Sequence, residues 1–190
     1  MTESIQLQTE RLFLIASTPA IARAEAADRA ELARLLGAEI HGAWPPGEND
    51  QEGRDFLCRR LEEHPEAVGF LGWSWLVRPQ AGAPERRPLL IGGGGFKGPP
   101  DPRGTIEIGY SIVEEYYGRG LATEAVGATL AWAFSDPRVR RVVAETLPEG
   151  RPSQRVLEKN GFVRANEAPS DPGSLRFELT REMWGARSSS

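Results

Sequence analysis

The residues from Thr105 to Thr123 have the types and the spacing of an anion-binding site. They form a predicted strand, a short loop with Gly118 and Gly120, and a helix that begins near Leu121. Glycines let successive backbone N–H groups approach a ligand because no Cβ obstructs them, and a helix start adds unpaired N–H donors and the positive end of its dipole. Arg119 adds a fixed positive charge. The spacing alone favours a pyrophosphate cradle about as much as a plain helix entry whose glycines only turn the chain.

Two other glycine-rich patterns fit this segment less well. A dinucleotide fold requires G-x-G-x-x-G directly after a strand, with an acidic residue ~20 positions further on. Here Thr123 stands at the third glycine position, and 114–117 separate the loop from the strand. Glu145 could still serve as the ribose-binding acid, so a dinucleotide-binding oxidoreductase remains an alternative. The chain has no Gly-Lys-Ser/Thr sequence, which excludes a P-loop.

The predicted elements place the loop inside one mixed α/β (α+β) domain. Strands are expected at 11–16, 69–77, 89–96, 105–113, 141–147 and 175–179, and helices at 19–36, 51–64, 121–134 and 152–159. We expect an exposed hairpin loop at 78–88, and close backbone packing or a bulge at the glycine run 92–95. No repeat or long linker divides the chain, so one domain is expected over 1–184, with helices on its sheet and a frayed tail at 185–190.

Composition excludes several classes of function. The chain has 190 residues, a net charge of −4 and a sequence pI near 5.4, so it has no general attraction for nucleic acid or anionic lipid. One cysteine, Cys58, and two histidines, His41 and His64, exclude a disulfide framework, a cysteine-rich zinc site and a multi-histidine metal site. The N-terminus does not read as a signal peptide, and the longest apolar stretch, 69–77, is shorter than the ~18 residues of a membrane span. We therefore expect a cytoplasmic protein without a metal.

Three segments together resemble a known family. Ile106–Ala125 (I-E-I-G-Y-S-I-V-x-x-x-Y-G-R-G-L-A-T-E-A) and Val156–Phe162 (V-L-E-K-N-G-F) resemble the GNAT superfamily of acyl-CoA-dependent N-acetyltransferases. Leu7–Leu12 (L-Q-T-E-R-L) resembles the start of its RimJ/RimL-like branch, which acetylates protein N-termini and sometimes small amines. The resemblance implies acetyl-CoA as acyl donor and a mixed, mostly antiparallel sheet of about six to seven strands. It also implies that this sheet splays beside the strand before the loop, with a bulge at Gly109.

The resemblance also implies which residues contact the acyl donor. The family's loop pattern, Gln/Arg-x-x-Gly-x-Gly/Ala, matches Tyr117–Ala122 in all but its first position. By resemblance, Ile112 and Val113 pair with the pantetheine arm, and residues 118–123 hold the pyrophosphate. The tetrahedral oxyanion of acyl transfer needs hydrogen-bond donors, and a backbone N–H near Tyr110 or Ile112 could supply one. The residues expected to contact the donor are Tyr110, Ile112, Val113, Tyr117, Gly118, Arg119, Gly120, Leu121, Ala122 and Thr123.

Acyl transfer to an amine also needs a base and help for the leaving thiolate. Glu107 matches a position where many relatives carry a base glutamate that acts directly or through water, and Glu145 on the neighbouring strand is its rival. Ser153 stands where the RimJ/RimL-like branch has a serine on the sulfur side, although a serine at a helix start is also an ordinary N-cap. Leu157 replaces the family's tyrosine, and Gly150 replaces its asparagine.

The acceptor side is less informative. Trp44, Trp73 and Trp75 could form an apolar acceptor wall, but aromatic residues more often lie in the core. We expect acetyl transfer to a primary amine, either a protein N-terminus or a small molecule, by direct attack in a ternary complex, and a homodimer is possible. A catalytically silent acyl-CoA-binding domain is the alternative, because Gly150 and Leu157 depart from the family pattern.

Overall fold

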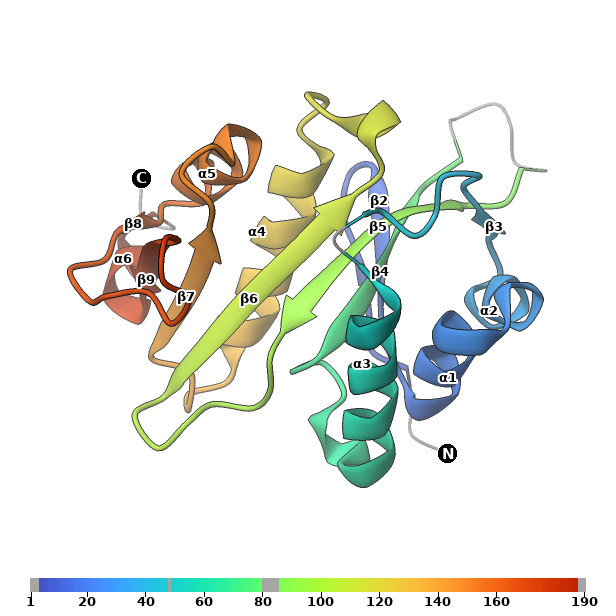
Figure 1. Cartoon of the computed structure of the whole chain (residues 1–190), viewed down its shortest axis with the longest axis horizontal. Helices are drawn as coiled ribbons and strands as arrows, with labels where there is room; N and C mark the ends of the chain where they lie inside the picture. Colours follow the sequence, from blue (N-terminus) through green and yellow to red (C-terminus); the bar gives the residue numbers. More distant parts are fainter. Residues whose placement is uncertain (1–3, 48, 80–85, 188–190) are drawn as a thin grey trace.

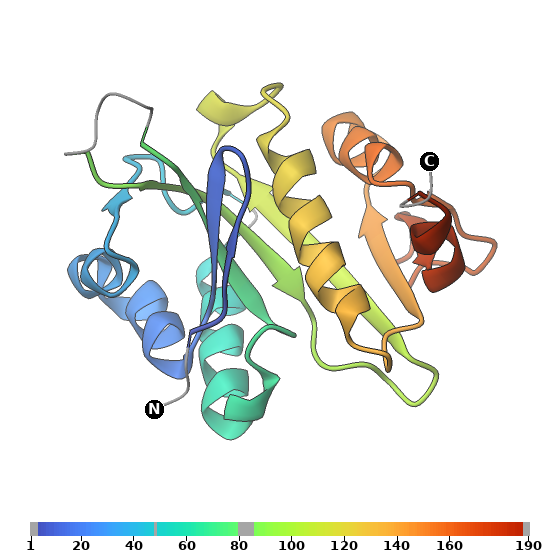
Figure 2. The ribbon, with the colours of Figure 1, turned by 180° about the vertical axis from the view of Figure 1, so that it is seen from behind.

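A computed structural model describes residues 4–47, 49–79 and 86–187, and in these residues one open sheet carries helices on both faces (Figures 1 and 2). The strands are β1 (Gln6–Gln8), β2 (Leu12–Ala16), β3 (Glu39–Ile40), β4 (Gly72–Val77), β5 (Leu89–Phe96), β6 (Thr105–Ile112), β7 (Arg141–Thr146), β8 (Val163–Arg164) and β9 (Leu175–Thr180). The helices are α1 (Pro19–Ala27), α2 (Arg29–Leu36), α3 (Gln51–Glu63), α4 (Leu121–Ser135), α5 (Arg151–Lys159) and α6 (Arg181–Arg187), with 3₁₀ turns at Pro65–Ala67 (η1) and Glu114–Tyr116 (η2).

The sheet has the order β1-β2-β4-β5-β6-β7-β9-β8, and β3 pairs with β5 beside this path. Only the β3–β5 and β6–β7 pairs are parallel, so the predicted mixed, mostly antiparallel sheet is confirmed. The six predicted strands are present. The strands β1, β3 and β8 were not predicted, because each has three residues or fewer and such short strands leave no periodic pattern.

Helices cover the two faces unequally. The helices α1, α2 and α3 lie on one face, over the half of the sheet that contains β2, β4 and β5 (Figure 1). The helix α4 crosses the opposite face (Figure 2), where its Leu130 and Val126 are fully buried in a core with Ile106 and Ile108 of β6. The helix α6 packs beside α4, since Trp184 stacks on Phe134 with ring centroids 5.5 Å apart.

The centre of the sheet opens between β6 and β7, as the family resemblance implies. These strands pair only from Thr105 to Glu107 on β6, whereas β7 pairs with β9 along its whole length to Thr146. From Ile108 onward β6 therefore pairs with β5 alone (Figure 1). The opening exposes one backbone edge of β6 to a ligand.

The bulge expected at Gly109 is wrong. Gly109 pairs in regular register with Gly95, and the register shift lies between Trp75 and Leu76 on β4. Close packing at the glycine run is confirmed, because a Cβ on Gly94 would lie 2.7 Å from the Cβ of Tyr110.

Three other predictions, one for a helix, one for the C-terminal tail and one for a loop, have different outcomes in the structure. The single helix expected over 19–36 is wrong, since Asp28 ends α1 and its carboxylate caps α2 by accepting hydrogen bonds from the N–H groups of Ala30 and Glu31 at 3.0 Å. Residues 185–187, expected in the frayed tail, belong to α6, and 188–190 lie outside the described residues. Residues 80–85 of the expected 78–88 loop also lie outside them. In the described ranges, no helix is both long and apolar enough to cross a membrane.

Candidate functional site

The loop between β6 and α4 presents a row of backbone donors. Gly118 and Gly120 have φ values of 72° and 76°, the left-handed region that favours glycine. Within the described part of the chain, the N–H groups of residues 118–123 donate no hydrogen bond, and only from Glu124 onward does α4 satisfy its own donors. A Cβ on Gly118 would meet nothing within 4 Å. The loop is therefore open and rich in free donors, which fits a diphosphate.

The open edge of β6 leads from this loop into the sheet. Tyr110 and Ile112 lie along this edge, and Val113 follows at its end. The Val113 N–H already donates to the carbonyl of Ile91 at 2.8 Å, so any backbone bond from Val113 to a ligand would use its carbonyl.

Tyr110 and Ser153 face each other across the opening. The Tyr110 hydroxyl lies 3.1 Å from the Ser153 hydroxyl and donates to the Ser153 backbone carbonyl, also at 3.1 Å. The N-cap of α5 is Gly150, and Ser153 lies inside the first turn, so the interpretation of Ser153 as an N-cap is wrong. The contact places a hydroxyl pair between the strand and the helix that flank the opening.

Glu107 lies at the closed end of the opening, as the last residue of β6 that pairs with β7. Its side chain is 19% exposed and forms an ion pair with the ammonium group of Lys97. Because side chains alternate along a strand, Glu107 and Tyr110 project from opposite faces of β6. A carboxylate and a hydroxyl pair thus flank the same opening from its two sides.

A family comparison accounts for this combination of cradle and splayed sheet. The profile of the family described as "Acetyltransferase (GNAT) domain" matches residues 20–163. The chain belongs to the GNAT acetyltransferase family.

Its relatives agree with this assignment. The uncharacterized N-acetyltransferase YjdG of Bacillus subtilis is 28% identical over 84% of this chain and 90% of its own length. YoaA of the same organism, also an uncharacterized N-acetyltransferase, is 26% identical over 72% of this chain and 81% of its own. The GNAT protein is therefore an N-acetyltransferase, and GNAT domains use acetyl-CoA as acyl donor. A dinucleotide-binding oxidoreductase is no longer needed to explain the loop.

Solved structures show the same fold at low identity. The ribosomal-protein-S5-alanine acetyltransferase from Vibrio fischeri superposes with a TM-score of 0.61 at 21% identity, and covers 95% of this chain and 98% of its own. A GNAT-family acetyltransferase from Bacillus anthracis gives a TM-score of 0.58 at 21% identity over 94% of this chain and 99% of its own. At such identities the likeness concerns the fold.

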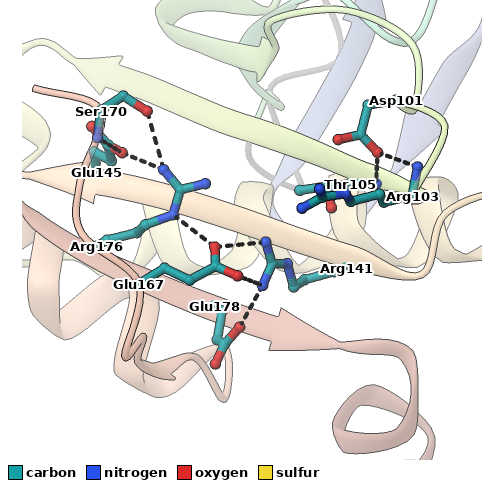
Figure 3. A network of polar contacts seen from close by, with 9 residues as sticks. All are labelled: Asp101, Arg103, Thr105, Arg141, Glu145, Glu167, Ser170, Arg176 and Glu178. Carbon is teal, nitrogen blue, oxygen red and sulfur yellow. Dashed lines mark hydrogen bonds and ion pairs between the residues drawn. The ribbon is translucent and has the colours of Figure 1, made fainter.

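In the GNAT domain, the carboxylate of Glu145 is engaged by other groups (Figure 3). It accepts hydrogen bonds from the backbone N–H of Ser170 at 2.7 Å and of Asp171 at 3.2 Å, and from Nη1 of Arg176 at 2.5 Å. Burial alone would raise the pKa of Glu145, but these bonds outweigh it and hold the pKa below its ordinary value. A carboxylate that is so well stabilised is a poor base, which argues against Glu145 in that role.

Glu145 instead belongs to a structural network. Arg141 contacts Glu167 at 2.9 Å and Glu178 at 3.2 Å, and Glu167 also approaches Nε of Arg176 at 3.9 Å (Figure 3). These contacts tie the segment before β9 to β7.

The three tryptophans expected at an acceptor wall lie in the core. Trp44, Trp73 and Trp75 are 7%, 2% and 1% exposed. Trp73 donates from Nε1 to the carbonyl of Gly69 at 2.9 Å and packs against Trp132, while Trp75 stacks on Tyr110. Their burial gives them a packing role, and their contact with an acceptor stays a prediction.

Sequence reasoning missed a group of polar residues that supports the GNAT loop. Arg11 donates from Nε to Glu124 at 2.7 Å and from Nη1 to the carbonyl of Arg119 at 2.8 Å, and the Arg119 guanidinium lies over the ring of Tyr116. The Thr9 hydroxyl donates to Glu124 at 2.6 Å. Burial tends to raise the pKa of Glu124, but the hydrogen bonds from Thr9 and Arg11 hold it below its usual value. The T-E-R stretch and the E of T-E-A are the signals that could have found this group.

Proposed function

We propose that the protein transfers an acetyl group from acetyl-CoA to a primary amine by direct attack in a ternary complex. The row of unpaired N–H groups at residues 118–123, which lies beside the open edge of β6, carries this proposal. In the proposed complex these N–H groups hold the diphosphate, with Arg119 adding charge and Tyr117, Leu121 and Ala122 forming the loop around it. The edge at Ile112 and Val113 takes the pantetheine arm.

Glu107 is the proposed base. An α-amino group has a pKa of about 8 and a lysine of about 10.4, so the attacking free amine is scarce at neutral pH. A carboxylate at the closed end of the opening can take the amine's proton directly or through a water molecule. The ammonium group of Lys97 forms an ion pair with this carboxylate. The backbone N–H of Tyr110 or Ile112 is proposed to stabilise the oxyanion.

Ser153 is the proposed donor to the leaving thiolate. A CoA-type thiol has a pKa of roughly 8.5, so a hydrogen bond to the departing sulfur lowers the barrier. The Ser153 hydroxyl can supply this bond if the Tyr110 hydroxyl, 3.1 Å away, turns its one proton from the Ser153 carbonyl to the Ser153 side-chain oxygen. This arrangement offers a hydroxyl donor although Leu157 replaces the family's tyrosine.

The proposed acceptor is a protein N-terminus or a small-molecule amine. Two observations support a place in the RimJ/RimL-like branch: the L-Q-T-E-R-L stretch, and the likeness in fold to the ribosomal-protein-S5-alanine acetyltransferase of Vibrio fischeri. The cytoplasmic location, the single domain over 1–184 and the possible homodimer stay predictions.

Mass spectrometry of an acceptor library incubated with acetyl-CoA tests the proposal. The library contains peptides with different N-terminal residues, lysine-containing peptides with blocked N-termini, and small primary amines. A gain of one acetyl group on an amine supports the proposal and identifies the acceptor. If CoA binds but no amine in any class is acetylated, the result favours the silent acyl-CoA-binding alternative, for which Gly150 and Leu157 are the sequence signals.

A further inference from the structure

The peptide bond between Arg119 and Gly120 is held in one of two orientations by a distant residue. Arg11, in the turn between β1 and β2, donates from Nη1 to the Arg119 carbonyl at 2.8 Å. In a trans peptide the carbonyl and the following N–H point in opposite directions. Because Arg11 fixes the carbonyl on its own side, the Gly120 N–H must point away from Arg11.

The hydrogen bond from Arg11 is needed because the residue after the Arg119 carbonyl is a glycine, Gly120. Gly120 has a φ of 76°, and a glycine populates negative φ about as readily, so the preceding peptide can rotate and turn its N–H inward. No other hydrogen bond to the Arg119 carbonyl is found in the described part of the chain. The orientation of this donor therefore depends on the Arg11 side chain.

Glu124 in turn fixes Arg11. One carboxylate oxygen accepts from the Arg11 backbone N–H at 2.8 Å and from the Thr9 hydroxyl at 2.6 Å, and the other accepts from Arg11 Nε at 2.7 Å. The Glu124 side chain is 17% exposed and lies in the first turn of α4, directly behind the loop. The Nε and Nη1 atoms of one planar guanidinium thus join α4 and the loop to the β1–β2 turn.

We propose that Arg11, clamped by Glu124, is a positioning residue that aims the Gly120 N–H at the diphosphate of the acyl donor. The inference rests on the proposed function, because it concerns the same site. According to this inference, the β1–β2 turn contributes to the affinity for CoA, although Arg11 in that turn lies 113 residues from Glu124 in the sequence.

Calorimetric titration with CoA tests this inference on three variants and a control. We expect Arg11→Ala and Glu124→Gln each to weaken the Kd for CoA at least fivefold. Arg11→Lys should also weaken it, because one ammonium group cannot reproduce the planar pair of contacts. Arg23→Ala is the matched control, since it removes another exposed Arg–Glu pair, Arg23–Glu62, and should leave the Kd within twofold of the wild type.

Glu124→Gln separates positioning from direct charge attraction. It leaves the Arg11 charge in place but loosens its clamp, so positioning predicts weaker binding. Binding as tight as the wild type or tighter, together with a weaker Arg11→Ala variant, would mean that Arg11 attracts the diphosphate directly, and would overturn the inference. A Kd within twofold of the wild type for Arg11→Ala also overturns it.

A spectroscopic readout keeps the test valid if a variant loses stability. The ¹H–¹⁵N signal of Gly120 should shift in free Glu124→Gln relative to the free wild type, because its peptide plane is no longer fixed, and an unchanged signal contradicts the inference. If Arg11→Ala does not fold, Arg11→Lys and Glu124→Gln decide the outcome. A wild-type protein that does not bind CoA refutes the proposed function, whereas wild-type binding with unaffected variants refutes this inference alone.

Discussion

Replacing Gly118 by Asp, and separately by Asn, measures the charge preference of the cradle. The two side chains have nearly the same shape, and both tolerate the left-handed conformation better than most residues do. A Cβ at Gly118 would meet nothing within 4 Å, so neither variant needs its neighbours to move. The backbone penalty at φ 72°, at most about 1–2 kcal/mol, is common to both and cancels in their comparison.

The two variants therefore differ only by one negative charge, which in the proposed complex lies beside a diphosphate. Two unit charges 4 Å apart interact by about 1 kcal/mol in water and about 4 kcal/mol at an effective dielectric constant of 20. A difference of about 1.4 kcal/mol is tenfold in affinity. We therefore predict that Gly118→Asp binds CoA at least tenfold more weakly than Gly118→Asn. The ratio should shrink in 1 M salt, where the Debye length falls to about 3 Å.

Isothermal titration of both variants with CoA at low and high salt provides the assay. Thermal unfolding of the two proteins checks that the strain is indeed shared. Equal CoA affinities for Asp and Asn at low salt would refute the cradle, since no diphosphate could then lie beside these N–H groups. A ratio that does not respond to salt would point to a steric cause instead.

Three further outcomes are expected. Glu107→Gln should lower the turnover rate, most strongly at low pH where the free amine is scarcest, and leave the Kd for CoA unchanged; an unaltered pH–rate profile would exclude Glu107 as the base. Tyr110→Phe should lower kcat with little change in the KM for acetyl-CoA. In a protein that already carries Ser153→Ala, the same Tyr110 substitution should have no additional effect on kcat. Fully additive losses of kcat in the double variant would argue against a shared hydroxyl pair. Glu145→Gln should cost about 1–3 kcal/mol of unfolding free energy at neutral pH. Because folding lowers the pKa of Glu145, its contribution to the free energy of unfolding is present above the ordinary carboxyl pKa and is lost as the pH falls through the folded value. The unfolding free energy of Glu145→Gln, measured in urea, should therefore depend less on pH in that range than that of the wild type. An equal pH dependence in the two proteins would contradict the role of the network.

The row of free backbone donors at residues 118–123 could be predicted because it depends on local structure. The free donors belong to the backbone, and a strand, two glycines two residues apart and a helix start fix their number and approximate direction. The same locality explains why most of the larger elements were predicted to within about one residue at each end, although the strand expected over 69–77 begins only at Gly72. It also explains one failure: the helix-forming run from Pro19 to Leu36 concealed the capping signal of Asp28, since propensity summed over a long window outweighs a single residue.

The side-chain partners could not be predicted in the same way. Tyr110 meets Ser153 across 43 residues, and Arg11 meets Glu124 across 113, so each contact exists only because the sheet order and its opening bring two segments together. The sequence alone also could not separate Glu107 from Glu145, because both are acidic residues on neighbouring strands. The difference arises from a third segment, whose Ser170 N–H and Arg176 side chain occupy one carboxylate and leave the other at the closed end of the opening with Lys97. The fold thus gives the two carboxylates different surroundings, and the pH profile of Glu107→Gln is the measurement that tests whether Glu107 is the base.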